Sequence, residues 1–299
     1  MISISLADQS RLEMIFSPNL EDVLYPKEAF SVFCDGLDHP EGLAFDNEQA
    51  LWGGGELGQI YRIDPDGRLI EVVRLGGFCL GLTFSARQEL WVCNSGLHAL
   101  MQVDRCGKLL ESINRIGDRP LKTPNFSVFD HQGNLYFSDS GEWDQNNSCL
   151  YRRCADGKTE LVAEPFAFAN GLAMSADDRF LFLVESQRDR VLRIPLVADG
   201  RVGKPEVYVE HMARIPDGLA LDAAGNLYVT CYASDCIYRV TPERRVQLLA
   251  FDPEGTRIAR PTNAAFGGPA LDDLYIANFG RWHIGRVHLG VAGQRLVNL

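Results

Sequence analysis

The sequence lacks the features of membrane-spanning and disulfide-stabilised proteins. None of its apolar runs approaches the ~20 residues that cross a bilayer, and residues 1–12 lack the basic segment and long apolar core of a secretion signal. Its eight cysteines include no Cys-x-x-Cys pair and lie in or beside apolar strands, which favours buried, reduced thiols. We therefore expect a cytoplasmic protein without a membrane partner.

The motifs of several enzyme classes are also missing. The sequence contains no Gly-x-Ser-x-Gly elbow of a serine esterase and no His-Glu-x-x-His helix of a zinc protease. Its glycine-rich segments, such as residues 53–58, precede no predicted helix and so do not support a nucleotide site. Positive charge is scarce as well: 29 Lys and Arg stand against 40 Asp and Glu, a net charge of −11. Such a field repels phosphate groups, which argues against nucleic acid and favours a small-molecule partner.

The sequence does contain one turn-and-strand unit repeated six times. In its clearest copy, residues 215–230, a turn that carries Asp217 leads into an apolar strand, a second turn and another strand. The place just before the first strand is taken in successive copies by Glu41, Leu80, Asn125, Asn170, Asp217 and Asn263. Their separations of 39, 45, 45, 47 and 46 residues match the period of a propeller blade. We predict an all-β fold, a six-bladed β-propeller with four-stranded antiparallel blades around a central channel.

The repeat predicts a single domain. We expect residues 1–28 to form an N-terminal leader and residues 29–299 to form the propeller, because no linker interrupts the copies. The last copy has three clear strands, near residues 263–266, 274–277 and 284–289. We predict that residues 29–34 supply its fourth strand, which would close the ring and remove two sheet edges. The alternative is a strand at residues 294–298.

The six aligned residues predict a metal site. The first strand of a propeller blade lines the channel, so the residues that precede these strands would form a ring. Two carboxylates and three amides, with Leu80 as the apolar exception, offer oxygen ligands suited to Ca²⁺, Mg²⁺, Mn²⁺ or Zn²⁺. A cation would also explain why two acids stand together in a narrow channel. Each motif alone is a common turn, and only the set in register indicates a site.

The loops between the second and third strands should rim the same end of the channel. They carry aromatic residues that would wall an apolar substrate, namely Trp143, Tyr232, Phe279 and Trp282. Glu142 or Arg281 would orient the polar end of that substrate. His98 and His283 are candidates for proton transfer, with a structural role favoured for each.

The entry motifs Pro40-Glu41-Gly42, Pro124-Asn125, Ala169-Asn170-Gly171-Leu172 and Pro216-Asp217-Gly218-Leu219 resemble the senescence-marker-protein/gluconolactonase/luciferin-regenerating-enzyme family, over about residues 30–290. The resemblance implies that Glu41, Asn170 and Asp217 bind one divalent cation, with Ca²⁺ the first expectation. It also implies that Asn125 is a fourth ligand or a substrate contact and that Asp217 is the catalytic acid/base. The implied activity is metal-dependent hydrolysis of a lactone or related ester, in which the cation polarises the carbonyl and a carboxylate activates water.

The sequence departs from the family pattern at two places. Phe126 and Thr123 stand where gluconolactonase-like members carry an aspartate and, in some of them, an arginine for sugar hydroxyls. This favours a substrate with a more apolar or aromatic body than a sugar. Residues 136–140 and 180–196 resemble strictosidine synthase-like proteins. A non-hydrolytic carbon–carbon bond-forming or lyase activity therefore stays open, as does a metal-stabilised binding propeller without turnover.

Overall fold

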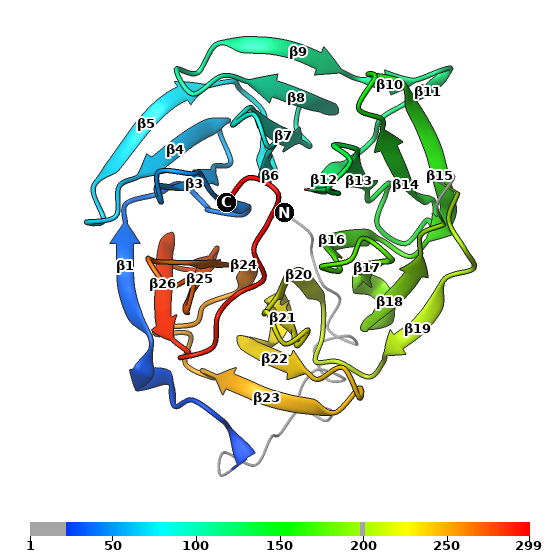
Figure 1. Ribbon diagram of the computed structural model, residues 1–299. Coiled ribbons are helices and arrows are strands. Elements are labelled where there is room, and N and C mark those ends of the chain that lie inside the picture. The colour runs from blue at the N-terminus through cyan, green and yellow to red at the C-terminus, as the bar shows by residue number, and fades with distance from the viewer. Residues whose placement is uncertain (1–21, 198–200) are drawn as a thin grey trace.

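The computed structural model describes residues 22–197 and 201–299. Within these residues the strands form six four-stranded antiparallel sheets and one two-stranded hairpin. The six larger sheets stand as blades around a central channel (Figure 1). The predicted six-bladed β-propeller is confirmed. In the same part of the chain no helix is long and apolar enough to cross a membrane.

Blades 1–5 each take four consecutive strands, counted from the channel outward. Blade 1 contains β2 (Leu43–Phe45), β3 (Leu51–Gly54), β4 (Gln59–Ile63) and β5 (Leu69–Arg74). Blade 2 contains β6 (Cys79–Phe84), β7 (Leu90–Asn94), β8 (Ala99–Val103) and β9 (Leu109–Ile113). Blade 3 contains β12 (Pro124–Phe129), β13 (Leu135–Asp139), β14 (Ser148–Arg153) and β15 (Thr159–Phe166).

The remaining elements complete the ring. Blade 4 contains β16 (Ala169–Met174), β17 (Phe180–Glu185), β18 (Arg190–Pro195) and β19 (Glu206–Val209). Blade 5 contains β20 (Pro216–Leu221), β21 (Leu227–Cys231), β22 (Cys236–Val240) and β23 (Val246–Phe251). Blade 6 contains β24 (Pro261–Gly267), β25 (Asp273–Asn278), β26 (His283–His288) and, outermost, β1 (Ser31–Asp35). The short elements are η2 (Lys27–Ala29), the hairpin β10 (Arg115–Ile116) with β11 (Arg119–Pro120), η3 (Ser186–Arg188) and η4 (Tyr232–Ser234).

Blade 6 combines strands from both ends of the chain, because the N-terminal strand β1 pairs with the C-terminal strand β26. Ser31 pairs with Arg286, and Asp35 pairs with His283, so the fourth strand comes from the N-terminal side and begins two residues later than predicted. Of the predicted leader, residues 1–21 lie outside the described residues. Its last part lies beside blade 5, where the Leu24 and Tyr25 N–H groups donate to β23.

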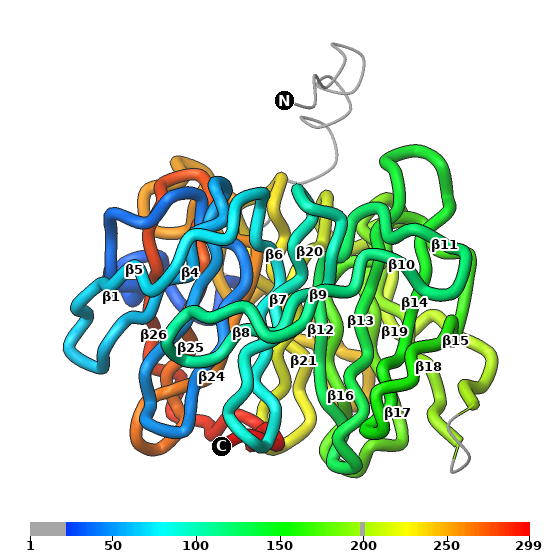
Figure 2. The backbone as a smooth tube through the Cα atoms, turned by 90° about the horizontal axis from the view of Figure 1, so that it is seen from above, coloured from blue at the N-terminus to red at the C-terminus, as the bar shows by residue number. Residues whose placement is uncertain are grey.

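The alternative strand at residues 294–298 does not form. This segment instead crosses the end of the channel at which the inner strands finish, and the C-terminus lies at that end (Figure 2). The Gln294 N–H donates to the Leu221 carbonyl oxygen, and the side chains of Gln294 and Asn298 donate to the carbonyl oxygens of Met174 and Phe45. We call residues 290–299 the tail; it joins blades 1, 4 and 5 across the axis.

Glycine allows the inner strands of neighbouring blades to approach closely. A Cβ atom on Gly171 would lie 2.3 Å from the carbonyl oxygen of Asp217, and one on Gly218 would lie 2.5 Å from that of Thr262. A side chain at either position would push two blades apart, since real Cβ atoms do not approach backbone so closely. The interfaces farther from the axis are aromatic and aliphatic, as where Trp52 meets Phe84 with ring centroids 5.5 Å apart.

Candidate metal and substrate site

A β-bulge opens the inner strand of several blades and places one side chain at the channel. In blade 5, Pro216 pairs with Cys231 but the next pair is Leu219 with Val229, so Asp217 falls within the bulge. The inner strands of blades 2, 3 and 4 have the same irregularity. Bulges of this kind re-aim a side chain and recur beside active sites. They bring the predicted residues, which are far apart in sequence, to one level of the channel.

The structure corrects the sixth member of this level. A Cβ atom on Gly171 would meet the Asp217 oxygen and the Gly218 Cα, whereas a Cβ atom on Gly218 would meet the Thr262 oxygen and the Asn263 Cα. Thr262 is therefore equivalent to Asp217, and the prediction of Asn263 was wrong by one residue. The bulge of blade 6 is shorter, since Pro261–Asn278 is followed directly by Asn263–Ala277. We call the corrected set the channel ring: Glu41, Leu80, Asn125, Asn170, Asp217 and Thr262.

The channel ring brings Glu41 and Asp217 together from blades 1 and 5. Both side chains are half-buried, and neither forms an ion pair with a Lys, Arg or His of the described residues. Burial raises the pKa of Glu41 well above its usual value, the negative charge of Asp217 raises it further, and a hydrogen bond with Thr262 opposes the shift. Burial raises the pKa of Asp217 to about 8 despite a hydrogen bond with Asn170. The pair thus lacks a positive partner.

The third predicted ligand, Asn170, lies beside Asp217. Its amide Nδ2 donates to Ser186 Oγ at 3.2 Å, while its Oδ1 is buried and has no hydrogen-bond partner within the described residues. A buried amide oxygen without a donor is uncommon in a folded protein and indicates an absent ion or water. Two adjacent carboxylates and a free amide oxygen are the donors that a hard divalent cation takes. These residues fit such a cation, although their role as ligands stays a prediction.

The other two predicted site residues have different surroundings. Asn125 is buried and belongs to the channel ring, because a Cβ atom on Gly81 would lie 2.5 Å from its carbonyl oxygen. Glu142 is exposed on the rim, where its carboxylate accepts hydrogen bonds of 2.9 Å from Lys122 and from Asn147. Both partners hold the pKa of Glu142 below its usual value. A substrate contact by Glu142 therefore has to compete with an existing ion pair.

The two predicted proton-transfer histidines have structural partners. His283 is buried, its Nε2 lies 3.2 Å from the Arg257 carbonyl oxygen, and burial lowers its pKa. The His98 Nδ1 contacts the Lys122 carbonyl oxygen on the rim. Arg281 likewise donates through Nε to the Gly255 carbonyl oxygen. These contacts favour the structural role for both histidines.

An aromatic wall covers one side of the channel mouth. Phe279 is its centre, with ring centroids 4.7 Å from His39, 5.8 Å from Tyr232 and 6.3 Å from Phe78, and Trp282 lies 4.5 Å from His39. We call these five residues the aromatic wall. Three were predicted as substrate contacts; the fourth, Trp143, instead pairs with Phe168 at 4.7 Å in another part of the rim.

Of the six residues that stand two positions before the channel ring, the sequence reasoning singled out only Thr123. These residues are His39, Phe78, Thr123, Phe168, Ile215 and Arg260, and four of them have left-handed backbones, with φ of 45° at His39, 58° at Phe168, 57° at Ile215 and 47° at Arg260. Non-glycine residues seldom adopt this conformation, and a β-branched residue almost never does. Such strain concentrates at functional sites. These residues could have been found in the sequence, because each precedes its channel-ring residue by two positions.

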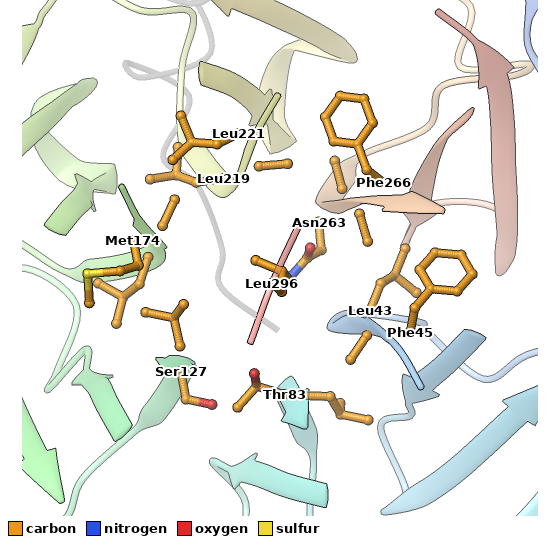
Figure 3. A pocket seen from close by; sticks show the side chains of 18 of the residues that line it. Leu43, Phe45, Thr83, Ser127, Met174, Leu219, Leu221, Asn263, Phe266 and Leu296 are labelled. Carbon is orange, nitrogen blue, oxygen red and sulfur yellow. The ribbon is translucent and has the colours of Figure 1, made fainter. Parts of the chain in front are cut away.

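Within the described residues, the pocket at the far end of the channel is lined by no aspartate or glutamate. Three residues beyond the channel ring, each inner strand carries a small side chain or a valine: Ala44, Thr83, Val128, Ala173, Ala220 and Ala265. Below them a largely apolar pocket is covered by the tail, with Leu296 near the axis (Figure 3). Asn263 Oδ1 and Ser127 Oγ are buried in its lining without a hydrogen-bond partner in the described residues.

Comparison with known proteins agrees with this geometry. The chain is 24% identical to the pentonolactonase XacC of Haloferax volcanii over 79% of each chain. Its fold matches a gluconolactonase from Xanthomonas campestris, with a TM-score of 0.76, 20% identity and coverage of 87% of this chain and 89% of that one. It also matches a calcium-binding regucalcin from Agrobacterium tumefaciens, with a TM-score of 0.76, 19% identity and coverage of 92% and 97%.

A family assignment follows from the sequence itself. Residues 77–279 match the SMP-30/Gluconolactonase/LRE-like region, a span that covers four blades in full and contains Asn125, Asn170 and Asp217. The match supports the gluconolactonase side of the predicted resemblance and gives no support to the strictosidine synthase-like features. The chain belongs to the SMP-30/gluconolactonase/LRE-like family of lactonase-type hydrolases.

Proposed function

We propose that this protein is a divalent-metal-dependent hydrolase that opens a lactone or a related ester. The observation that carries the proposal is the pair of carboxylates, Glu41 and Asp217, held side by side without a cationic partner in the described residues and next to the unpartnered Oδ1 of Asn170. Such a pair is unfavourable unless it binds protons or a cation. The calcium-binding relative supports Ca²⁺ as the first candidate.

The channel's own residues would perform the remaining steps. Glu41, Asn170 and Asp217 would hold the cation, with Asn125 at the same level as a further ligand or a substrate contact. When bound, the cation supplies positive charge that polarises the carbonyl oxygen and stabilises the developing oxyanion. Asp217 accepts a proton as water attacks the carbonyl carbon. The bond from that carbon to the ring oxygen then breaks, the ring oxygen takes up the proton, and a hydroxy acid leaves.

The proposal is tested by measuring metal content and hydrolysis together. We expect about one Ca²⁺ or other divalent ion per chain by elemental analysis, hydrolysis of γ- or δ-lactones or aryl esters, loss of turnover in EDTA, and recovery when the ion is returned. Glu41→Gln should lose both the ion and the activity, whereas Glu48→Gln, an exposed glutamate in the turn after β2, should keep both.

Two outcomes would contradict the proposal. Hydrolysis that persists in metal-free protein carrying Asp217→Ala would remove both the cation and the base from the mechanism. A bound ion without turnover of any lactone or aryl ester would indicate a metal-stabilised binding propeller instead.

A further inference from the structure

Arg260 stands at the edge of the aromatic wall, and its guanidinium forms no ion pair within the described residues. The Arg260 Nη1 lies 3.3 Å from the Tyr232 hydroxyl, and its guanidinium carbon is 5.6 Å from the centroid of that ring. Its backbone N–H donates to Asp235 Oδ1 at 2.5 Å. No carboxylate of the described residues lies within ion-pair distance of the guanidinium. The side chain is exposed but supported on one face by Tyr232.

Three other basic residues on this rim are paired with acids, whereas Arg281, which also forms no ion pair in the described part of the chain, donates through Nε to the Gly255 carbonyl oxygen. Lys122 is paired with Glu142 at 2.9 Å. Arg190 lies 2.5 Å and Arg188 3.7 Å from the buried Glu185. Their charges are compensated within the protein. Arg260 thus offers a guanidinium that is not engaged in an ion pair with any described residue, near a channel that contains the acids Glu41 and Asp217.

Arg260 and the carboxylate pair are linked through Thr262 and Tyr232. Arg260 stands two residues before Thr262, whose hydroxyl donates to the Glu41 carbonyl oxygen at 3.3 Å. Tyr232 lies near both features: burial raises the pKa of its hydroxyl, Arg260 opposes the shift, and the charges of Glu41 and Asp217 add to it. The aromatic wall therefore connects a positive edge at Arg260 with the site proposed for bond cleavage.

These surroundings define the chemistry of a ligand. The wall offers aromatic surface, and Trp282 keeps 48% of its surface exposed, which suits an apolar or planar body. The protein carries a net charge of −11 and would repel an anion elsewhere on its surface. A guanidinium binds carboxylates through charge-assisted hydrogen bonds, commonly two at once.

We propose that Arg260 and the aromatic wall form a subsite for the carboxylate of a substrate that also carries an aromatic or similarly planar, apolar body. The preferred substrates are then lactones or esters with such a body and a carboxylate placed away from the scissile bond. This inference rests on the proposed function for the reaction. The binding subsite itself is independent of turnover.

The experiment uses a matched pair of ligands that the protein does not hydrolyse. Binding of 3-phenylpropionate and of neutral 3-phenylpropionamide to the Ca²⁺-loaded protein is measured by calorimetry and by tryptophan fluorescence. The wild type should bind the carboxylate about tenfold more tightly than the amide, the size of one charge-assisted contact. Arg260→Gln should reduce this ratio to about one and leave the affinity for the amide unchanged. Trp282→Ala should weaken both ligands.

The control is Arg87→Gln, which removes one exposed positive charge in the turn after β6, at the other end of the channel. It should keep the tenfold ratio, and circular dichroism should report the same fold for all variants. The inference is overturned if the wild type shows no preference for the carboxylate, if Arg260→Gln keeps the preference, or if Arg87→Gln abolishes it as well. Because no hydrolysis is measured, a failure of the lactonase assay leaves this test intact.

Discussion

Two aspartates stand near opposite ends of β20, Asp217 as its second residue and Asp222 just after it, and their carboxylates have opposite environments. Asp217, at the channel mouth, stands beside another acid and receives one amide hydrogen bond. Asp222, in the turn at the far end, accepts hydrogen bonds from the Ala224 and Asn226 N–H groups and from the Tyr228 hydroxyl. Asp222 is satisfied by the fold, whereas Asp217 is not. Asp222 therefore stabilises its blade, whereas Asp217 is present at a cost to the stability of the fold.

The largest expected effect comes from making the same substitution at both aspartates. Asp217→Asn should lower kcat/KM for lactone hydrolysis by about 10³-fold, within the range of a lost general base, and should raise the melting temperature of the metal-free protein because it removes a like-charge contact. Asp222→Asn should instead lower the melting temperature. It places an amide N–H against donors, which costs about 1–3 kcal/mol, and should leave kcat/KM within about twofold. Equal losses of activity in the two variants would contradict the contrast.

A second comparison tests how tightly the blades meet at the channel ring. Gly171→Ala places a methyl group 2.3 Å from the Asp217 carbonyl oxygen, and such overpacking costs about 1–3 kcal/mol. Because the contact is with Asp217 itself, activity should fall along with stability. Gly53→Ala, whose methyl group would have its nearest neighbour at 3.6 Å, is the matched control in β3. Melting curves and lactone assays of both variants measure the difference, and comparable effects of the two would refute it.

The carboxylate pair also predicts a dependence of stability on pH. Burial raises the pKa values of Glu41 and Asp217, the latter to about 8, so the folded, metal-free protein holds these protons to a higher pH than the unfolded chain does. The associated stability is complete below the usual carboxyl pKa and is lost as the pH rises towards about 8. In EDTA the melting temperature should therefore fall by several degrees from about pH 5 to about pH 9.

Added Ca²⁺ should offset this loss, because it binds the deprotonated pair. The rise in melting temperature on adding Ca²⁺ should accordingly be larger at the higher pH. The Glu41→Gln, Asp217→Asn double variant should show neither trend. If it retains the same pH dependence, other groups are responsible.

The smallest effect is expected from the tail. Asn298→Ala removes the side-chain hydrogen bond to the Phe45 carbonyl oxygen, worth about 1 kcal/mol and a shift of about 2–4 °C in melting temperature. Hydrolysis should be unchanged, because the tail lies at the far end of the channel from Asp217. Reduced kcat/KM without reduced stability would indicate that the two ends are coupled.

The sequence predicted the parts of the structure that repeat. The period placed Glu41, Asn170 and Asp217 in one ring because each follows the same turn and precedes the same kind of strand. The error at Asn263 arose where blade 6 shortens its bulge by one residue, which spacing alone cannot reveal. The aromatic wall was only partly predicted, since His39 and Phe78 come from connections between blades, and which of those side chains meet depends on how neighbouring blades pack.

The pairing of β1 with β26 also has a consequence during synthesis. Ser31 pairs with Arg286, so the sheet of blade 6 cannot be completed until the ribosome has synthesised the 255 residues that follow Ser31, up to Arg286. At about 5–20 residues per second, translation of that interval takes roughly 10–50 s. For this time a nascent β1 has no strand to bind, and its free edge is open to pairing with other chains on the same messenger. Chaperone occupancy on the ribosome is thus expected to be greatest just before the final blade emerges.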